Sequence, residues 1–461
     1  MYRKKYHIFF VGIGGIGMSG IAELLLTLGY RVSGSDIAMS DVTQRLEKLG
    51  GKIFKGHHAD HITDVDVVVT SSAISEENPE VLAALEASVP VIPRAEMLAE
   101  LMRLKYSIAV AGAHGKTSTT SMLAGVLAEG GLDPTVVIGG KLKSINSNAV
   151  LGKGDYIVAE ADESDGSFLK FSPTIAVVTN IDLEHVDFYG NIENIKSVFL
   201  NFIDRIPFYG LAVLCLDNAA VQEIIPKVKK RFVTYGLNAQ ADIQARDVEF
   251  EGMQSRFNVY RNDAFYGQVA LNMPGIHNVY NSLAAISVGF ELDIPFKKIQ
   301  IALEQLQGVA RRLEVKGDVA GIKVLDDYGH HPTEIKVTLD AVRKSWSGRR
   351  LVVIFQAHRY SRTKSLYDDF TRAFYQSDLL LLLPVYAAGE ERIEGIDNVM
   401  LCEGIKRHGH KEVSYVNDMT QAVDYLAGIV RKGDLVLTLG AGDVWKCGEL
   451  LIKKLSGKKN E

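Results

Sequence analysis

The feature that most constrains the fold is a glycine loop between a strand pattern and a helix pattern. The apolar run Ile108 to Val110 leads into Gly112 to Thr117, and a helical pattern follows. Backbone N–H groups of such a loop would cradle phosphate, with Lys116 between the β and γ positions and the Thr117 hydroxyl facing Mg²⁺. Val110 stands where the usual G-x-x-x-x-G-K-T pattern has its first glycine. The sequence therefore predicts a shortened phosphate loop, and a glycine turn with a surface lysine is the alternative interpretation.

A second glycine loop lies near the N-terminus. Gly12 to Gly17 follows the strand pattern Ile8 to Val11 and opens a helix, and Asp36 follows the next strand pattern. This is the dinucleotide fingerprint, in which glycines admit a pyrophosphate and the acid accepts a hydrogen bond from a ribose hydroxyl. Alone it predicts a nucleotide diphosphate, and a tight turn with no ligand is the alternative.

Short strand patterns alternate with helical patterns along all 461 residues. This alternation predicts an α/β fold on mainly parallel sheets, and at ~150 residues per domain the length predicts about three domains. We place them at residues 1–106, 107–313 and 314–461. We expect a Rossmann-like N-terminal domain, a P-loop-type central ATPase domain and a Rossmann-like C-terminal domain.

Composition excludes several classes of protein. Hydrophobic residues make up 47% and charged residues 23%, which is ordinary for a globular chain and unlike a disordered one. The net charge of −5 offers no overall positive field for a nucleic acid. The longest apolar run, Leu379 to Ala388, contains Pro384 and is too short to span a membrane. The three cysteines are few and far apart, so we expect packing residues in a cytoplasmic protein.

Polar residues follow two further strand patterns of the central region. Glu160 comes after Tyr156 to Ala159, and His185 comes after Ile175 to Val178. Because parallel strands end at the same edge of a sheet, both can converge on metal ions bound to the phosphates of ATP. A buried core histidine is the alternative for His185. The neighbouring acids are best interpreted as a solvated acidic loop, namely Asp162, Glu163 and Asp165.

Taken in order, the motifs resemble those of the Mur ligases of bacterial peptidoglycan synthesis over essentially the whole chain. The matching segments are Gly12 to Gly20, Ala113 to Thr117, Glu160 to Asp165, Asn180 to His185, His277 to Asn281, Arg311 to Glu314, Asp326 to Pro332 and His358 to Arg362. The ordered set is far more specific than any one of its members.

The resemblance implies three domains that bind, in order, a UDP-sugar, ATP and an amino acid. Within the family, the pattern is similar to that of members that join L-alanine to the lactyl carboxylate of UDP-N-acetylmuramate. In that reaction ATP phosphorylates the carboxylate, and the amine of L-alanine attacks the acyl phosphate. The expected cofactors are ATP and Mg²⁺. We expect a monomer or a weak homodimer with no nucleic-acid or membrane partner.

The resemblance also implies roles for individual residues, which fall into four groups. The ATP contacts are Gly112, His114, Gly115, Lys116, Thr117, Ser118, Asn278, Asn281, Arg312 and Asp327, with Arg311 as the alternative to Arg312. The metal ligands are Thr117, Glu160 and His185. The UDP-sugar contacts are Gly14, Gly15, Gly17, Asp36, His57, Ser71 and Arg94. The amino acid and the transferring phosphoryl group are received by Tyr328, His330, Arg359 and Arg362.

Chemistry supports the last group independently, because carboxylates and phosphates both favour guanidinium groups. Surface ion pairs are the alternative for Arg359 and Arg362.

Three other functions remain open at this point. An NAD-dependent dehydrogenase would explain the first glycine loop but not the loop at Lys116. A sister ligase that reattaches recycled peptide to the same UDP-sugar usually lacks the segment found at His358 to Arg362. A non-catalytic UDP-sugar sensor would not need Lys116, Thr117, Glu160 and His185.

Overall fold

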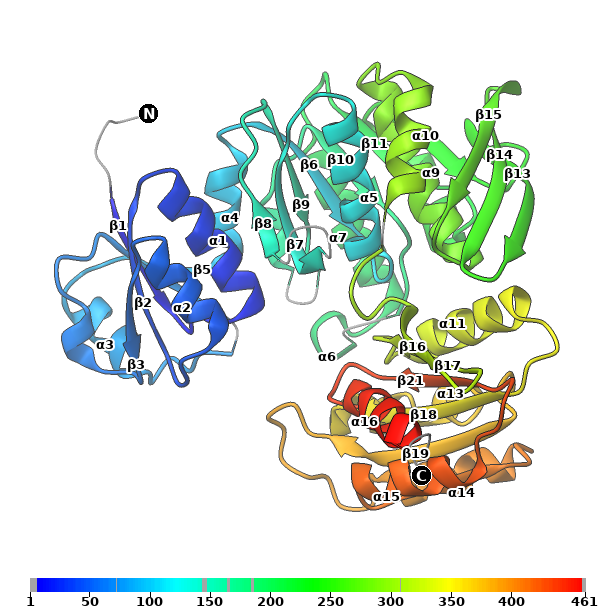
Figure 1. Ribbon diagram of the computed structural model, residues 1–461. Coiled ribbons are helices and arrows are strands. Elements are labelled where there is room, and N and C mark those ends of the chain that lie inside the picture. Colours follow the sequence, from blue (N-terminus) through cyan, green and yellow to red (C-terminus); the bar gives the residue numbers. More distant parts are fainter. Residues whose placement is uncertain are drawn as a thin grey trace. The chain divides into compact units, whose positions relative to one another are not determined.

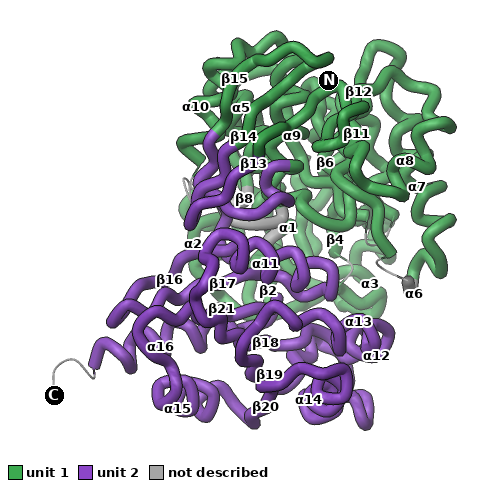
Figure 2. The backbone as a smooth tube through the Cα atoms, turned by 90° about the vertical axis from the view of Figure 1, so that its right-hand side faces the viewer, with its two compact units in different colours: residues 1–247, 257–269, 280–306 green, residues 248–256, 270–279, 307–461 purple. Residues whose placement is uncertain are grey.

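The computed structural model describes residues 6–71, 73–142, 147–163, 166–183, 186–306 and 308–457. It contains three β-sheets that are connected and covered by helices, so the predicted α/β class is confirmed (Figure 1). The chain forms two compact units (Figure 2). The first comprises residues 1–247, 257–269 and 280–306, and the second comprises residues 248–256, 270–279 and 307–461.

The N-terminal sheet has the strand order β3-β2-β1-β4-β5, and its neighbouring strands are parallel. A central β1 with the chain wound to both sides is the Rossmann arrangement, as predicted. The strands are β1 (His7–Val11), β2 (Arg31–Asp36), β3 (Lys52–Lys55), β4 (Val67–Thr70) and β5 (Val91–Pro93). The helices are α1 (Ile16–Thr27), η1 (Ala59–His61), α2 (Asp41–Lys48), α3 (Pro79–Glu86) and α4 (Arg94–Met102).

The central sheet has ten strands in the order β15-β14-β13-β12-β11-β10-β6-β9-β7-β8. The run from β12 through β11, β10, β6 and β9 to β7 is parallel, which brings the carboxyl ends of β6, β9 and β10 to one edge. The strands are β6 (Tyr106–Ala111), β7 (Thr135–Leu142), β8 (Ser147–Val150), β9 (Tyr156–Glu160), β10 (Ile175–Val178), β11 (Leu211–Cys215), β12 (Phe232–Gly236), β13 (Ile243–Glu251), β14 (Gln254–Arg261) and β15 (Ala264–Leu271).

α-Helices and short 3₁₀ helices, the latter labelled η, connect the central strands. They are α5 (Lys116–Glu129), η2 (Ser167–Lys170), α6 (Val186–Tyr189), α7 (Ile192–Asp204), α8 (Ala219–Ile224), η3 (Ile225–Lys227), α9 (Ile276–Glu291) and α10 (Phe296–Gln305). Strands β13, β14 and β15 follow one another in the chain and lie side by side at one edge of this sheet. Asn262 and Asp263, which separate β14 from β15, both have positive φ, as a tight two-residue hairpin turn requires.

The C-terminal sheet has the order β16-β17-β21-β18-β19-β20, and only the β16–β17 pair is antiparallel. The strands are β16 (Glu314–Val319), β17 (Ile322–Asp327), β18 (Leu351–His358), β19 (Leu379–Tyr386), β20 (Val413–Tyr415) and β21 (Leu435–Leu439). The helices are α11 (Pro332–Ser345), α12 (Tyr360–Ser365), α13 (Tyr367–Phe370), α14 (Asn398–Arg407), α15 (Met419–Ile429) and α16 (Trp445–Gly457).

Alternate residues of the C-terminal strands enter two separate hydrophobic cores. Val353 and Phe355 of β18 pack with α11, α13 and α14, whereas Val352 and Ile354 pack with α15 and α16. Because side chains of a strand point to opposite faces in turn, a sheet covered on both faces needs the unbroken apolar strands seen here.

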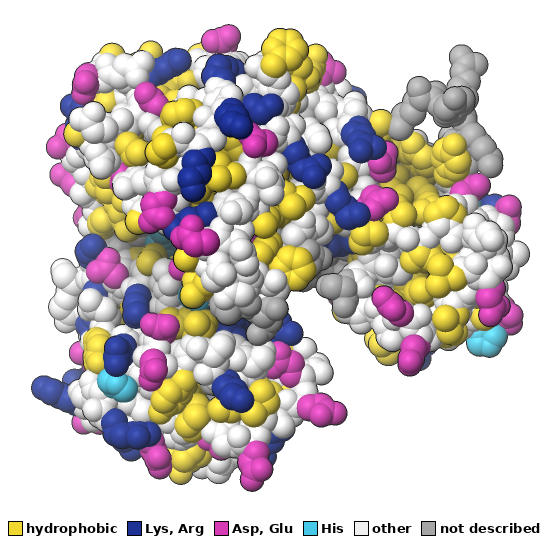
Figure 3. Space-filling view, turned by 180° about the vertical axis from the view of Figure 1, so that it is seen from behind, with side chains coloured by type: hydrophobic (Ala, Val, Ile, Leu, Met, Phe, Trp, Pro, Cys, Tyr) yellow, Lys and Arg dark blue, Asp and Glu magenta, His cyan; other side chains and the backbone are white. Residues whose placement is uncertain are grey.

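The surface agrees with the composition. On the face shown in Figure 3, Lys and Arg side chains lie among Asp and Glu side chains on both units. Cys215, Cys402 and Cys447 are buried and unbridged, as predicted for packing residues. Within the described part of the chain, the helices are too short or too polar to cross a membrane.

Candidate active site

The predicted phosphate loop joins β6 to the N-terminus of α5. Gly112 and Gly115 both have positive φ, at +139° and +82°. A Cβ atom at Gly112 would lie 2.1 Å from Oγ1 of Thr179, and one at Gly115 would lie 2.5 Å from Oδ1 of Asn281. Conformation and space therefore both require glycine at these positions.

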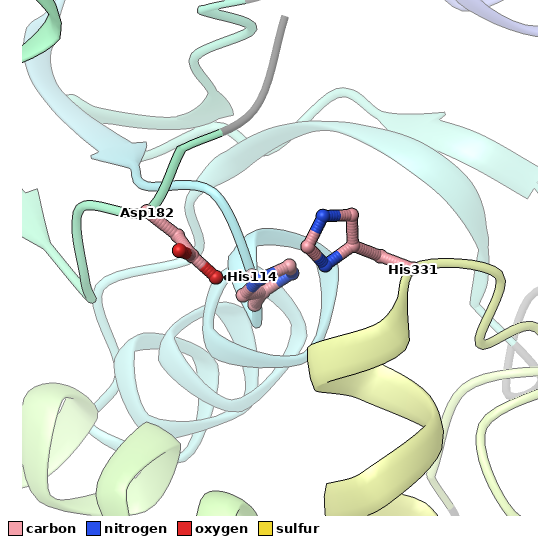
Figure 4. Close-up of side chains that lie close together, drawn as sticks. All are labelled: His114, Asp182 and His331. Atoms are coloured by element: carbon pink, nitrogen blue, oxygen red, sulfur yellow. Dashed lines mark hydrogen bonds and ion pairs between the residues drawn. The ribbon is translucent and has the colours of Figure 1, made fainter. Parts of the chain in front are cut away.

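The end of β10 holds this loop in place. Asn180 accepts a hydrogen bond from the His114 backbone N–H at 2.8 Å and donates one to the His114 carbonyl at 2.9 Å. The Thr179 hydroxyl donates to the same carbonyl at 2.6 Å. Nε2 of His114 lies 3.0 Å from a carboxylate oxygen of Asp182 (Figure 4). The predicted ATP contact His114 is thus fixed by the segment that follows the neighbouring strand.

Lys116 is the first residue of α5, and its ammonium group is surrounded by oxygen. Nζ donates to the carbonyls of Gly112 and Ala113 at 2.7 and 3.3 Å and to Oε1 of Glu163 at 2.8 Å. Burial lowers the pKa of Lys116, but the carboxylates of Glu163 and Glu160 raise it further, so that it lies above its ordinary value. Lys116 therefore remains a cation inside the loop.

Thr117 and Glu160 form the oxygen cluster expected of a magnesium site. The Thr117 hydroxyl lies 3.1 and 3.0 Å from the two carboxylate oxygens of Glu160, which ends β9. Hydroxyl and carboxylate oxygens are hard ligands of the kind that Mg²⁺ prefers. His185, the third predicted metal ligand, lies outside the described residues.

The interpretation of Glu163 as part of a solvated loop is wrong. Its side chain is 4% exposed and is paired with Lys116. The Tyr189 hydroxyl donates to its backbone carbonyl. Glu163 is therefore removed from solvent beside Lys116, whose side chain is 15% exposed. Asp162 is 46% exposed, and Asp165 lies outside the described residues.

The N-terminal glycine loop is held by the acid that the fingerprint predicted. Asp36 accepts hydrogen bonds from the Gly14 N–H at 2.8 Å and from the Ala38 N–H at 3.2 Å. A Cβ atom at Gly14 would lie 2.8 Å from the Asp36 carboxylate. Asp36 therefore shapes the loop itself, and a contact from Asp36 to a ribose hydroxyl stays a prediction.

One cavity brings together residues predicted for two different ligands. It has a volume of about 330 Å³. Arg94 lines it and lies 3.8 Å from Asp162. The other lining residues are Gly12, Gly15, Gly17, Met18, Ser71, Leu98, Val137, Ile138, Glu160 and Asp162. Most of the predicted UDP-sugar contacts thus share a cavity with the predicted metal ligand Glu160.

His57 is placed differently and is not among the described residues that line this cavity. Its Nδ1 lies 2.9 Å from Glu80, a fully buried carboxylate that also accepts a hydrogen bond from Ser35 at 2.6 Å. Nδ1 of His61 lies 2.6 Å from the other oxygen of Glu80. A contact between His57 and the UDP-sugar stays a prediction.

Asn278 and Asn281 share helix α9, and both are buried. Asn278 donates to the carbonyl of Pro274 at 2.7 Å. Asn281 accepts from the Thr119 hydroxyl at 3.1 Å, so it also supports the start of α5 behind the phosphate loop. Their predicted contact with adenine stays a prediction.

In the second unit, Arg311 and Arg312 have different surroundings. The Arg311 guanidinium pairs with Asp326 at 3.0 Å and donates to the carbonyls of Gly440 and Gly442 at 2.5 and 3.1 Å. Arg312 lies 3.8 Å from Glu334. The guanidinium donors of Arg311 are thus occupied by contacts within the protein. This favours Arg312 for the predicted ATP contact.

Asp327 is turned toward the protein interior. One carboxylate oxygen accepts from the Leu313 N–H at 2.8 Å, and the other accepts from the Gly329 N–H at 2.8 Å and from the Thr338 hydroxyl at 3.2 Å. Burial raises the pKa of Asp327 to about 6, although the charge of Arg312 lowers it. These contacts fix the backbone before β16 and after β17, and a direct ATP contact stays a prediction.

The residues predicted to receive the amino acid lie together at the carboxyl ends of β17 and β18. The rings of Tyr328 and His330 are 5.4 Å apart, those of His330 and His358 are 5.8 Å apart, and His358 stacks on Tyr386 at 5.5 Å. Burial lowers the pKa values of His330 and His358 to about 4, with the charge of Arg362 acting in the same direction. Both rings are therefore neutral at pH 7.

The tautomer of His330 follows from its neighbours. Nδ1 lies 3.2 Å from the Tyr328 carbonyl and 3.3 Å from a carboxylate oxygen of Glu334, and both of these groups are acceptors. The hydrogen of the neutral ring is therefore assigned to Nδ1, which leaves a lone pair on Nε2.

Arg359 and Arg362 lie at the start of the short helix α12. Arg359 pairs with Glu390 at 2.7 Å and is 48% exposed. Nη1 of Arg362 lies 3.5 Å from Nδ1 of His358. The Arg362 guanidinium thus lies beside the row of rings, and the predicted role of both arginines stays a prediction.

Sequence reasoning missed several residues that organise the site. Glu163, Asn180, Glu80 and Glu390 were given no role, although the first two lie inside recognised motifs. The position of Glu163, three residues after the strand-end acid Glu160, was the one available signal. Glu80 and Glu390 reach their partners only through tertiary structure.

Each of the three sheets lies largely in a segment that matches a Mur ligase family model. Residues 7–106 match the Mur ligase family catalytic domain, residues 110–289 match the Mur ligase middle domain, and residues 311–442 match the Mur ligase glutamate ligase domain.

Similar proteins cover the whole chain. The UDP-N-acetylmuramate–L-alanine ligase of Desulfatibacillum aliphaticivorans is 64% identical over 99% of this chain and all of its own length. That of Desulfosudis oleivorans is 65% identical over 97% of this chain and 98% of its own. The crystal structure of UDP-N-acetylmuramate-alanine ligase from Thermotoga maritima has a TM-score of 0.82 at 30% identity, covering 98% and 100% of the two chains. A murein peptide ligase from Psychrobacter arcticus has a TM-score of 0.70 at 26% identity, covering 98% of each chain.

The buried ring of His277 makes the stability of the second unit dependent on pH. Burial and the nearby Arg312 lower its pKa to about 4, while Glu334 opposes them. Because the unfolded chain then binds more protons between pH 6.5 and pH 4, stability falls as pH falls through this window. Between pH 7 and pH 5, the free energy of unfolding measured with urea should fall by about 2 kcal/mol less in the variant His277→Gln than in wild type.

The matched control is His58→Gln, since the side chain of His58 is 67% exposed. It should keep the pH dependence of the wild type. An identical pH dependence in wild type and His277→Gln would contradict the assignment.

Proposed function

The chain belongs to the Mur ligase family, and from this premise we propose that its site joins L-alanine to the lactyl carboxylate of UDP-N-acetylmuramate with ATP as the phosphoryl donor. The reaction supplies a precursor of peptidoglycan. The observation that carries the proposal is the single cavity shared by the N-terminal glycine loop, Arg94 and Glu160. It supports a site in which the sugar substrate meets the metal and phosphate groups.

The proposed roles follow from the contacts. In the first step a lactyl carboxylate oxygen attacks the γ-phosphorus and ADP leaves. In the second step the amine attacks the acyl carbon, phosphate leaves and the nitrogen loses a proton. Lys116 neutralises phosphate charge, and the N–H groups of the Gly112 to Gly115 loop orient the phosphates. Arg359 and Arg362 bind the amino-acid carboxylate and the transferring phosphoryl group.

Thr117 and Glu160 would hold Mg²⁺, which supplies charge neutralisation at the phosphate oxygens. The fit rests on the two carboxylate oxygens gathered within 3.1 Å of the Thr117 hydroxyl. His185 is proposed as a further ligand.

His330 is proposed to orient the incoming amine. Its ring is neutral at pH 7, and the lone pair on Nε2 can accept a hydrogen bond from the nucleophilic nitrogen. The reaction is proposed to take place in the cytoplasm, where ATP is available, with the protein as a monomer or a weak homodimer.

The alternatives have less support. A dehydrogenase leaves the Lys116 loop and its ion pair with Glu163 unexplained. A sensor would not need the oxygen cluster at Thr117 and Glu160. A peptide-reattaching ligase resembles the chain less than the L-alanine ligases do and usually lacks the segment at His358 to Arg362. An assay of ADP release with UDP-N-acetylmuramate and a panel of amino acids tests the choice, with L-alanine as the preferred substrate.

The variant Lys116→Ala should lower turnover strongly and leave the affinity for the UDP-sugar unchanged, because the two glycine loops belong to different sheets. Loss of one preorganised charge contact lowers kcat by about 10²–10³-fold, or roughly 3–4 kcal/mol. Calorimetry with UDP-N-acetylmuramate measures binding separately. The exposed Lys153 provides the control Lys153→Ala. A comparable loss of UDP-sugar affinity in Lys116→Ala would refute this division of roles.

The variant Glu160→Ala should raise the Mg²⁺ concentration required for half-maximal activity, since its carboxylate is proposed as a direct or water-bridged ligand. Titration of activity with MgCl₂ measures the change, and removal of the metal by a chelator should stop the wild-type reaction. The exposed Glu86 gives the control Glu86→Ala. An unchanged Mg²⁺ requirement would contradict Glu160 as a metal ligand and would make it an acid of the loop without a role in metal binding.

A further inference from the structure

Strand β18 ends in an unusual backbone conformation. Arg359, the next residue, has φ +72° and ψ 132°. A residue with a Cβ atom rarely adopts this region and does so only when its surroundings impose it. The Arg359 N–H donates to the carbonyl of Tyr386 at 2.8 Å, so the turn is tied to the end of β19.

One carboxylate fixes this turn from the other side. Oε1 of Glu390 lies 2.7 Å from Nε of Arg359 and 2.6 Å from the Ser361 hydroxyl. Oε2 of Glu390 accepts from the Ser361 N–H at 3.0 Å. Glu390 thus binds a guanidinium, a hydroxyl and a backbone N–H within three consecutive residues.

The segment that delivers Glu390 is itself constrained. After β19, Ala388 and Gly389 have φ values of +51° and +87°, and the Glu390 N–H donates to the Ala387 carbonyl at 3.0 Å. Two successive left-handed residues turn the chain back toward α12. Two tight turns, after β18 and after β19, are therefore joined by the Glu390 carboxylate.

Glu390 is ionised at neutral pH. Partial burial opposes ionisation, but hydrogen bonds from Ser361 and the charge of Arg359 hold its pKa below the ordinary value. The side chain of Glu390 is 19% exposed, whereas that of Arg359 is 48% exposed. The acid is the enclosed member of the pair, and the guanidinium faces solvent.

The pairing uses only part of the guanidinium. Among the described residues, Glu390 engages Nε of Arg359, and neither Nη nitrogen has a hydrogen-bond partner in that set. This ion pair restrains the guanidinium group at Nε. A planar fork held in this way matches a carboxylate that binds through two parallel hydrogen bonds.

We propose that Glu390 is a positioning residue that holds Arg359 so that its two Nη nitrogens bind the carboxylate of the incoming amino acid. The inference rests on the proposed function and adds a residue to it. Glu390 acts through Arg359 and does not itself contact the substrate.

The test uses the full-length protein and the variant Glu390→Gln, which preserves size and removes the charge. The KM for L-alanine should rise on the order of tenfold, the usual effect of weakening a hydrogen bond to a charged group. The KM values for ATP and UDP-N-acetylmuramate should stay unchanged. The neighbouring exposed acid gives the matched control Glu391→Gln, which should behave as wild type.

A double-mutant cycle separates positioning from folding. In the Arg359→Lys background the fork is absent, so Glu390→Gln should produce no further rise in the KM for L-alanine. The same rise in that background, or an equal rise in all three KM values together with a lower unfolding temperature, would overturn the proposal in favour of a structural role. If wild type released no ADP with L-alanine, the function itself would fail, and the positioning role would fall with it.

Discussion

The ion pair between Lys116 and Glu163 is the interaction on which the phosphate side of the first unit depends. Nζ and Oε1 are 2.8 Å apart, the two side chains are 15% and 4% exposed, and the pair joins the start of α5 to the segment after β9. Because β6 and β9 are parallel neighbours, the phosphate loop and the acids leave the same edge of the sheet. The register of the sheet therefore brings Lys116 to Glu163 and Thr117 to Glu160 together. An anionic ligand that takes Lys116 must compete with Glu163 for it.

In the second unit a pair of buried acids has the corresponding role. Asp326 neutralises Arg311, and Asp327 accepts hydrogen bonds from the backbone before β16 and after β17. Arg311 and Leu313 both have positive φ, at +61° and +45°, so the chain reverses direction around Arg312. This local conformation places the Arg311 guanidinium among carbonyl groups and leaves the side chain of Arg312 beside Glu334. The physical difference between two adjacent arginines is thus a matter of backbone geometry.

Local patterns were sufficient to predict an α/β fold on mainly parallel sheets, both glycine loops and a helix after each loop. The domain limits at 106 and 313 and the individual ligand contacts stay predictions. Sequence could not distinguish Arg311 from Arg312, because the distinction depends on Gly440 and Gly442, more than a hundred residues away. Glu163 was misjudged for a related reason: its burial follows from how the chain turns after β9, and an acidic segment carries no periodic signal for that turn.

The same arrangement recurs at three of the cations that are proposed to meet an anionic ligand. Lys116 is paired with Glu163 and Arg359 with Glu390 at 2.8 and 2.7 Å, and Arg94 lies 3.8 Å from Asp162. Each acid reduces the positive charge that a ligand encounters, in a chain whose net charge is already −5. Each acid also restrains a long side chain that would otherwise lose up to ~2 kcal/mol of rotamer freedom when a ligand fixes it. The pairs thus weaken the long-range attraction of an anionic ligand, and they hold the cationic side chain in place before the ligand binds. Affinity for phosphates and carboxylates in this protein must therefore arise from fixed geometry at short range, which is where transition states differ from bound substrates.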